Sequence, residues 1–250
     1  MDKALSPQQL YWLMRKLYGS GVRGFLISGG FTREGKLPFH NYLSVIREFK
    51  EKYESVISIH PGLVSREEAR MLREARIDII DLEFSLYPTF TEKVKGLGPR
   101  AIEQYARTLK ALYEEGPSYI APHILVGSGL GLLGNEPAEL WFLKDYDPYI
   151  IVLLIYAPTK NTPSEKDPEP EPEYVLETVK YIRRNYSGEL SLGCMRPWGR
   201  YKSIVDDLLL RENLLDRIAN PPRQLIEKHG LETIHACCSI PREYEELFKQ

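Results

Sequence analysis

The feature that most constrains the fold of this chain is a regular alternation of short β-rich runs with amphipathic helical stretches. Runs that predict strands cover residues 24–28, 56–60, 77–83, 119–124, 149–156, 190–193, 214–219 and 232–237. The stretches between them carry apolar residues at helical spacing. Strands that alternate with helices pair in parallel, and seven or eight such units fit a closed barrel. We therefore expect residues 1–250 to form one α/β domain, a TIM-type (β/α) barrel, with an open doubly wound sheet as the alternative.

Local signals mark several ends of the predicted helices. Ser65 with Glu68 forms a capping box at a helix start, and Asn220 and Gly230 are expected to begin and end the last helix. One segment, residues 158–172, is rich in proline and acidic residues and follows a predicted strand. Proline excludes a helix or an interior strand there. We expect a long loop at the carboxyl end of the barrel strands, where barrel active sites form.

Composition excludes several classes of function. The formal net charge of -2 provides no basic field for a nucleic-acid partner. No apolar run reaches the roughly 18 residues needed to span a bilayer, and the N-terminus carries no signal-peptide core. We expect a cytoplasmic protein that acts on a small molecule. Six Asn and five Gln, against abundant charged residues, indicate a thermophile.

Polar and glycine residues stand at the ends of successive predicted strands, where a barrel places its chemistry. They are Ser28, Gly29, Gly30, His60, Asp81, Glu83 and His123. Parallel barrel strands are otherwise apolar, so titratable residues at neighbouring strand ends indicate a binding site. The two glycines allow the backbone to approach a ligand closely. For any one of these residues the alternative is a structural role.

The later half of the chain adds further candidates. Arg196 follows a predicted strand and can grip a carboxylate by two parallel hydrogen bonds. The three cysteines of the chain, Cys194, Cys237 and Cys238, are metal-ligand candidates, although adjacent residues of a strand point to opposite faces. Glycines in residues 127–134 predict a ligand-approach loop. Their G-x-G-x-x-G string lacks the first βαβ unit that a dinucleotide site requires.

Six motifs together resemble the radical S-adenosylmethionine superfamily, and in particular homologues of biotin synthase. They are GFLISGG at 24–30, HPGLVSREEA at 60–69, PHILVG at 122–127, APT at 157–159, LGCMRP at 192–197 and HACCS at 235–239. The resemblance implies a radical-type (β/α) barrel that binds S-adenosylmethionine. It assigns the cofactor's amino group to Ser28, Gly29 and Gly30. It places Glu83 and the PHILVG strand near the ribose and adenine.

The sequence departs from this superfamily at its catalytic motif. The family holds a 4Fe–4S cluster with a C-x3-C-x2-C segment, and residues 1–23 contain no cysteine. We therefore expect a barrel that is incomplete at its first strand and does not bind the cluster by itself. Three explanations remain open: a truncated gene product, a split enzyme whose second polypeptide supplies the segment, or a non-catalytic barrel that binds a ligand or partner.

The resemblance implies radical chemistry for sulfur insertion, as in biotin or lipoyl synthesis, once the cluster is supplied. The three cysteines would then serve an auxiliary cluster or sulfur handling. An ordinary barrel aldolase or hydrolase is a further alternative, since Asp81 and Glu83 share one face of a predicted strand.

Overall fold

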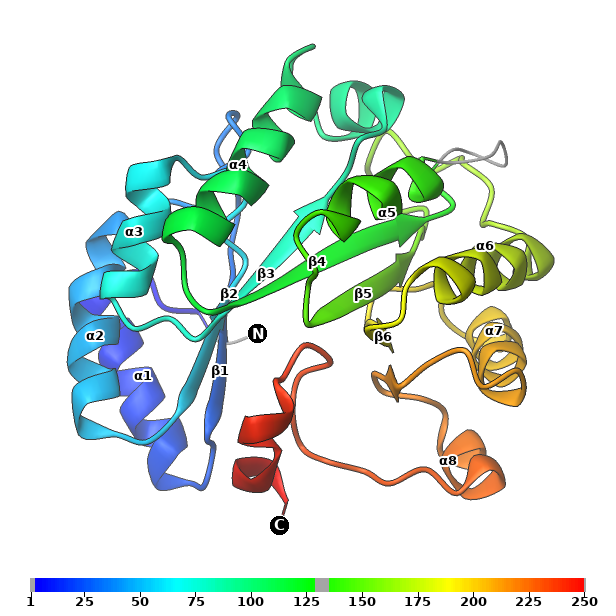
Figure 1. Ribbon diagram of the computed structural model, residues 1–250. Coiled ribbons are helices and arrows are strands. Elements are labelled where there is room, and N and C mark those ends of the chain that lie inside the picture. Colours follow the sequence, from blue (N-terminus) through cyan, green and yellow to red (C-terminus); the bar gives the residue numbers. More distant parts are fainter. Residues whose placement is uncertain (1–2, 129–134, 250) are drawn as a thin grey trace. The chain divides into compact units, whose positions relative to one another are not determined.

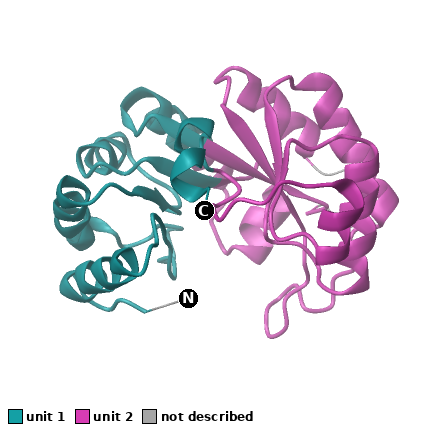
Figure 2. Ribbon diagram, turned by 90° about the horizontal axis from the view of Figure 1, so that it is seen from below, with its two compact units in different colours: residues 1–82, 106–120, 240–250 teal, residues 83–105, 121–239 magenta. Residues whose placement is uncertain are grey.

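The computed structural model describes residues 3–128 and 135–249 (Figure 1), and the chain divides into two compact units (Figure 2). Unit 1 comprises residues 1–82, 106–120 and 240–250, and unit 2 comprises residues 83–105 and 121–239. Each unit consists of parallel strands and helices, so the predicted α/β class is confirmed. None of the helices in the described residues has both the length and the apolar character needed to cross a membrane.

Unit 1 is built on three strands in chain order. They are β1 (Gly24–Ile27), β2 (Val56–Ile59) and β3 (Ile79–Phe84), whose last two residues belong to unit 2. Its helical elements are α1 (Pro7–Gly19), η1 (His40–Tyr42), α2 (Leu43–Lys52), α3 (Arg66–Glu74) and η3 (Arg242–Phe248). Strands β1 and β2 pair in parallel with Ile27 opposite Ile59, and β2 pairs with β3 in the same direction. Helices α1, α2 and α3 cover one side of these strands (Figure 1).

The helices of unit 1 form where the sequence places caps and apolar stripes. The Ser65 side chain accepts a hydrogen bond from the Glu68 amide, and the Glu68 side chain accepts one from the Ser65 amide, which confirms the predicted capping box. Helix α2 buries Leu43, Ile46 and Phe49 on a single stripe. These contacts fix α2 and the start of α3 in unit 1.

Besides β3, two further elements cross between the units along the chain. Helix α4 (Ala101–Glu115) begins in unit 2 and ends in unit 1, and strand β4 (Tyr119–Val126) begins in unit 1 and continues in unit 2. The remaining elements of unit 2 are η2 (Phe90–Val94), α5 (Glu136–Lys144), β5 (Ile150–Ile155), α6 (Pro172–Asn185), β6 (Glu189–Leu192), α7 (Arg200–Arg211), β7 (Arg217–Ile218) and α8 (Arg223–His229). Strands β4 to β7 pair in parallel in chain order, with His123 opposite Val152. Helices α5, α6, α7 and α8 each pack against the next.

The described residues form seven parallel strands, an arrangement consistent with a partial TIM-type barrel. Six of the predicted strands are confirmed within two residues at each end. The predicted strand at 214–219 shrinks to β7. The predicted strand at 232–237 is wrong, because this segment is irregular. Most of its side chains are exposed, so the segment has no apolar face that packs against a core.

The last helix begins later than predicted. Asn220 has a left-handed backbone with φ of 46°, so the chain turns there, and Pro222 precedes the first helical residue of α8. Gly230 ends the helix in the left-handed conformation, as predicted. Residues 158–171 form neither helix nor strand, which confirms the long loop after β5.

Candidate ligand-binding site

The turn after β1 contains the three residues that the family resemblance assigns to binding the cofactor's amino group. Ser28, Gly29 and Gly30 are all exposed. A Cβ atom at Gly29 would lie 3.1 Å from Leu37 Cδ1, whereas a Cβ atom at Gly30 would have no atom within 4 Å. The backbone at Gly30 therefore borders open space that a bound molecule can enter.

His60 occupies the matching position at the end of β2. Because Ile27 and Ile59 are partners in the parallel ladder, Ser28 and His60 leave their strands at the same level. The His60 amide donates to the carbonyl of Ile27 at 3.0 Å, and its Nδ1 lies 2.9 Å from the carbonyl oxygen of Asp81. A carbonyl oxygen can only accept, so Nδ1 carries the proton in this contact. Unit 1 thus brings His60 beside the Ser28 turn.

The loop of residues 31–39 is tied to the turn after His60. Lys36 and Gly62 form an antiparallel bridge, and the Leu63 amide donates to the carbonyl of Gly35 at 2.9 Å. Gly62 has φ of 69°, and a Cβ atom there would lie 2.2 Å from the Gly35 carbonyl oxygen. Only glycine fits this position. The glycine of the HPG string is therefore explained by backbone packing.

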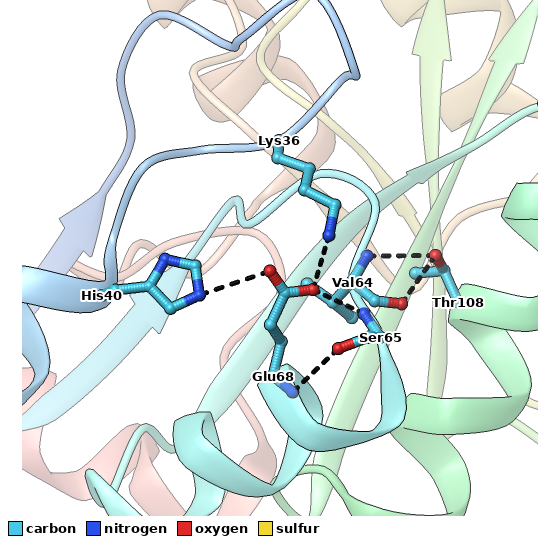
Figure 3. A network of polar contacts seen from close by, with 6 residues as sticks. All are labelled: Lys36, His40, Val64, Ser65, Glu68 and Thr108. Atoms are coloured by element: carbon cyan, nitrogen blue, oxygen red, sulfur yellow. Dashed lines mark hydrogen bonds and ion pairs between the residues drawn. The ribbon is translucent and has the colours of Figure 1, made fainter.

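Glu68 anchors the same loop to the start of α3 (Figure 3). Lys36 Nζ lies 2.7 Å from Glu68 Oε2, and His40 Nε2 lies 3.3 Å from Glu68 Oε1. The Ser65 amide also donates to Oε2 at 2.7 Å. Burial alone would raise the pKa of Glu68, but the Lys36 and Ser65 hydrogen bonds hold this pKa below its usual value. Through these contacts the ionised Glu68 carboxylate holds the loop of residues 31–39, which follows the Ser28 turn, against the start of α3.

A second polar group lies in unit 2, around the end of β3. Glu83 forms an ion pair with Lys95, and Lys95 Nζ donates to the Tyr105 hydroxyl at 3.2 Å. Burial alone would lower the pKa of Lys95, but Glu83 and Tyr105 raise it above its ordinary value. Lys95 therefore stays protonated. The Glu83 carboxylate remains partly exposed, and its predicted ribose contact stays a prediction.

Two buried carboxyl groups of α5 were not singled out as site residues from the sequence. Glu136 Oε1 accepts from the Gly127 amide at 2.7 Å, and Tyr174 donates to both Glu136 oxygens at 3.2 Å. Glu139 accepts from the Leu86 amide at 2.8 Å, and burial raises the pKa of Glu139 to about 8. The only sequence signal for them is an acidic residue on an apolar helix stripe. These residues organise the loops after β3 and β4.

His123 and Arg196 lie in structural positions within unit 2. His123 is buried, and its Nδ1 lies 2.9 Å from the carbonyl of Ala121 on the same strand. Arg196 Nε and Nη2 donate to the two Asp206 oxygens at 2.7 and 2.9 Å. Both side chains of that ion pair are fully buried. Arg196 therefore grips a carboxylate of the protein itself, and its predicted role toward a ligand stays a prediction without support from these contacts.

The cysteines do not gather into one cluster. Cys194 and Cys237 are exposed and Cys238 is half-buried, and all three are thiols. Within residues 3–128 and 135–249, no group of three or more His, Cys, Asp or Glu side chains is placed to hold a metal ion. Cys237 and Cys238 are not on a strand, so the expectation of opposite faces is wrong: their sulfur atoms lie 4.0 Å apart. The glycines at 129, 131 and 134 lie outside the described residues.

Comparison with known proteins shows the fold. The sequence matches no protein-family model and no curated protein. Its structure is similar to HydG, a maturase of the FeFe-hydrogenase, with a TM-score of 0.67, 15% identity and 91% of this chain covered. It is also similar to HydG from Carboxydothermus hydrogenoformans, with a TM-score of 0.61, 16% identity and 86% of this chain covered. The chain spans about half of these two proteins, 56% and 51%.

A third similar structure is methylornithine synthase, PylB. The TM-score is 0.56 with 16% identity, covering 97% of this chain and 68% of PylB. At these identities the similarity concerns the fold alone. The chain therefore has the α/β fold of parallel strands that HydG and PylB share, and its activity is a separate question.

Proposed function

We propose that this chain is the S-adenosylmethionine-binding barrel of a radical-type enzyme related to biotin and lipoyl synthases. The observation that carries the proposal is the exposed Ser28–Gly29–Gly30 turn at the carboxyl end of β1, with open space beside Gly30. HydG and PylB, which share the fold, are radical S-adenosylmethionine enzymes. The six sequence motifs support the same superfamily independently of the fold.

The residues present fit the adenosyl ligand better than they fit an iron–sulfur cluster. Three thiolates are needed to hold the 4Fe–4S cluster of this superfamily. The chain has three cysteines, at 194, 237 and 238, without the C-x3-C-x2-C spacing. The described residues contain no group of three such ligands either. We infer that radical chemistry requires a cluster segment from outside these 250 residues, and no chemical step through the cluster follows from this chain.

The turn residues have a defined task in ligand binding. Backbone N–H and C=O groups at Ser28, Gly29 and Gly30 can meet the amino and carboxylate groups of the ligand, because glycine lets a ligand approach the main chain. The Lys36–Glu68 ion pair holds the neighbouring loop. Without cluster iron, which normally chelates the amino-acid end of the ligand, the affinity is weak. We expect a dissociation constant on the order of 0.1 to 1 mM, equivalent to about 4 to 5.5 kcal/mol.

Calorimetric titration with S-adenosylmethionine tests this proposal. The informative variant is Gly30→Val, because its side chain would enter the open space, whereas a Cβ atom at Gly29 would first meet Leu37. Gly98→Val is the matched control, since a Cβ atom there also meets nothing within 4 Å. We expect binding by the wild type and Gly98→Val, and at least about a tenfold loss in Gly30→Val. Equal binding by all three proteins, or none by the wild type at several millimolar, would refute the site.

A non-catalytic barrel that binds a ligand or partner is the second candidate, and the absence of the C-x3-C-x2-C spacing favours it. Anaerobic reconstitution with iron and sulfide separates the two candidates when repeated with a peptide that carries a C-x3-C-x2-C segment. The chain alone is expected to assemble no cluster with S-adenosylmethionine cleavage activity. Cleavage that appears only with the added segment supports the split-enzyme form, and binding without cleavage in every mixture supports the binding subunit.

A further inference from the structure

Cys237 and Cys238 form a pair of neighbouring thiols that the proposed adenosyl site does not use. Their Sγ atoms lie 4.0 Å apart, and the Ser239 hydroxyl donates to Cys237 Sγ at 3.5 Å. Cys237 is exposed and Cys238 half-buried. A reagent can therefore reach the pair from solvent.

The chain beyond the pair is firmly held. Ser239 is fully buried, and its carbonyl oxygen accepts a hydrogen bond from the Tyr149 hydroxyl at 2.5 Å. This contact fixes the backbone immediately after Cys238. Binding at the pair consequently requires less ordering of the chain than binding at a free loop would.

Backbone geometry disfavours a disulfide between the two residues. The peptide bond that joins them is trans, which sets their Cα atoms about 3.8 Å apart. Unstrained disulfides need Cα atoms about 4.4 to 6.8 Å apart. The pair is therefore expected to persist as two thiols, which bind metals once they are deprotonated to thiolates.

The sulfur separation suits one metal ion held by both thiolates. With a metal–sulfur distance of about 2.3 Å, sulfur atoms 4.0 Å apart subtend an angle of about 120° at the metal. That is the angle of trigonal coordination. Each thiol releases one proton as its sulfur binds, so a divalent ion enters in exchange for two protons.

We propose that Cys237 and Cys238 form a dithiolate site for a soft, thiophilic metal ion. Thiolates select such ions over magnesium or calcium. The described part of the chain places no group of three such ligands there, and Cys237 is exposed, so a third ligand would come from solution. The metal site uses none of the residues of the Ser28 turn. A test of metal binding can therefore give a positive or negative result whatever the result for S-adenosylmethionine binding.

Titration of the fully reduced protein with Cd²⁺ under inert gas tests the site through sulfur-to-metal absorption in the ultraviolet. We expect one ion per chain and a loss of affinity of at least about tenfold in Cys237→Ser and Cys238→Ser. Cys194→Ser is the matched control, an exposed thiol outside the pair, and should bind like the wild type. Equal weakening in all three variants, or no binding by the wild type at micromolar Cd²⁺, would overturn the proposal.

A second probe tests the pairing first in the wild-type chain. Phenylarsine oxide reacts with two nearby thiols to form two arsenic–sulfur bonds, and its oxygen leaves as water with both thiol protons while arsenic stays trivalent. Mass spectrometry of the intact wild-type chain should show one such adduct. Failure to form it, or an adduct that persists in Cys238→Ser, would contradict a dithiol at this position.

Discussion

Glu139 is the carboxyl group whose protonation should couple most strongly to folding. It is 2% exposed, and burial raises its pKa to about 8 from its ordinary value of 4.5. The folded chain therefore holds a proton that the unfolded chain releases between those two pH values. The free energy of unfolding that protonated Glu139 contributes is fully present below its pKa in the unfolded chain, and it is lost as the pH rises toward 8. Glu139→Gln should remove this dependence, since an amide keeps the acceptor for the Leu86 amide.

The magnitude follows from the two pKa values. Each pH unit in the interval costs about 1.36 kcal/mol of unfolding free energy for one proton. Between about pH 5.5 and about pH 7.5, the wild type should lose about 2.5 kcal/mol more stability than Glu139→Gln. Burial also raises the pKa of Glu136, so that residue contributes in the same direction. The difference between the two proteins isolates Glu139, and Glu136→Gln is the neighbouring control.

Urea denaturation at both pH values, followed by circular dichroism, measures the difference. A carbon-13 titration of the Glu139 carboxyl group, assigned by its absence in Glu139→Gln, measures the pKa directly. A pKa near the ordinary value, together with the same pH dependence in wild type and variant, would refute the assignment of Glu139 as a buried neutral acid.

Two further predictions concern positions that the sequence motifs marked. Gly62→Ala should cost roughly 3 kcal/mol of unfolding free energy, because its Cβ atom would lie 2.2 Å from the Gly35 carbonyl oxygen. Gly230→Ala also has a positive φ, of 60°, but its Cβ atom would meet nothing within 4 Å, so it should cost only about 1 kcal/mol. Equal urea midpoints for the two variants would contradict this. Arg196→Met should cost about 3 to 5 kcal/mol by leaving Asp206 buried and unpaired, and Arg196→Met combined with Asp206→Leu should recover part of that loss. A double variant no more stable than the single one would be the contrary result.

Most strands could be predicted because their side chains are buried along the whole run. Strands β2 and β5 are almost wholly apolar and buried, which a sequence displays directly. The segment 232–237 mixes Thr, Ile and Cys with Glu and His, and in the structure most of its side chains are exposed, which only the tertiary structure decides. Local caps such as Ser65 with Glu68 were predictable because both partners lie within four residues.

The site was harder to predict, because its contacts join segments that are distant in sequence. Lys36 reaches Glu68 across 32 residues, and the Leu86 amide reaches Glu139 across 53 residues. Neither pairing has a periodicity or a spacing that a sequence displays. Arg196 shows the opposite error. Its position after a strand suggested a contact with a ligand, but in the structure its guanidinium binds the buried carboxylate of Asp206, ten residues later.

An adenosyl ligand bound at the turn after β1 is the central expectation for this chain. Amide nuclear magnetic resonance spectra during titration with S-adenosylmethionine test it most directly, with Gly29 and Gly30 as reporters and Gly98 as the reference. The proposal predicts progressive shifts of the Gly29 and Gly30 amide signals that saturate in the millimolar range, while the Gly98 signal stays in place. Unchanged Gly29 and Gly30 signals at several millimolar ligand, or a shift at Gly98 of the same size, would contradict it.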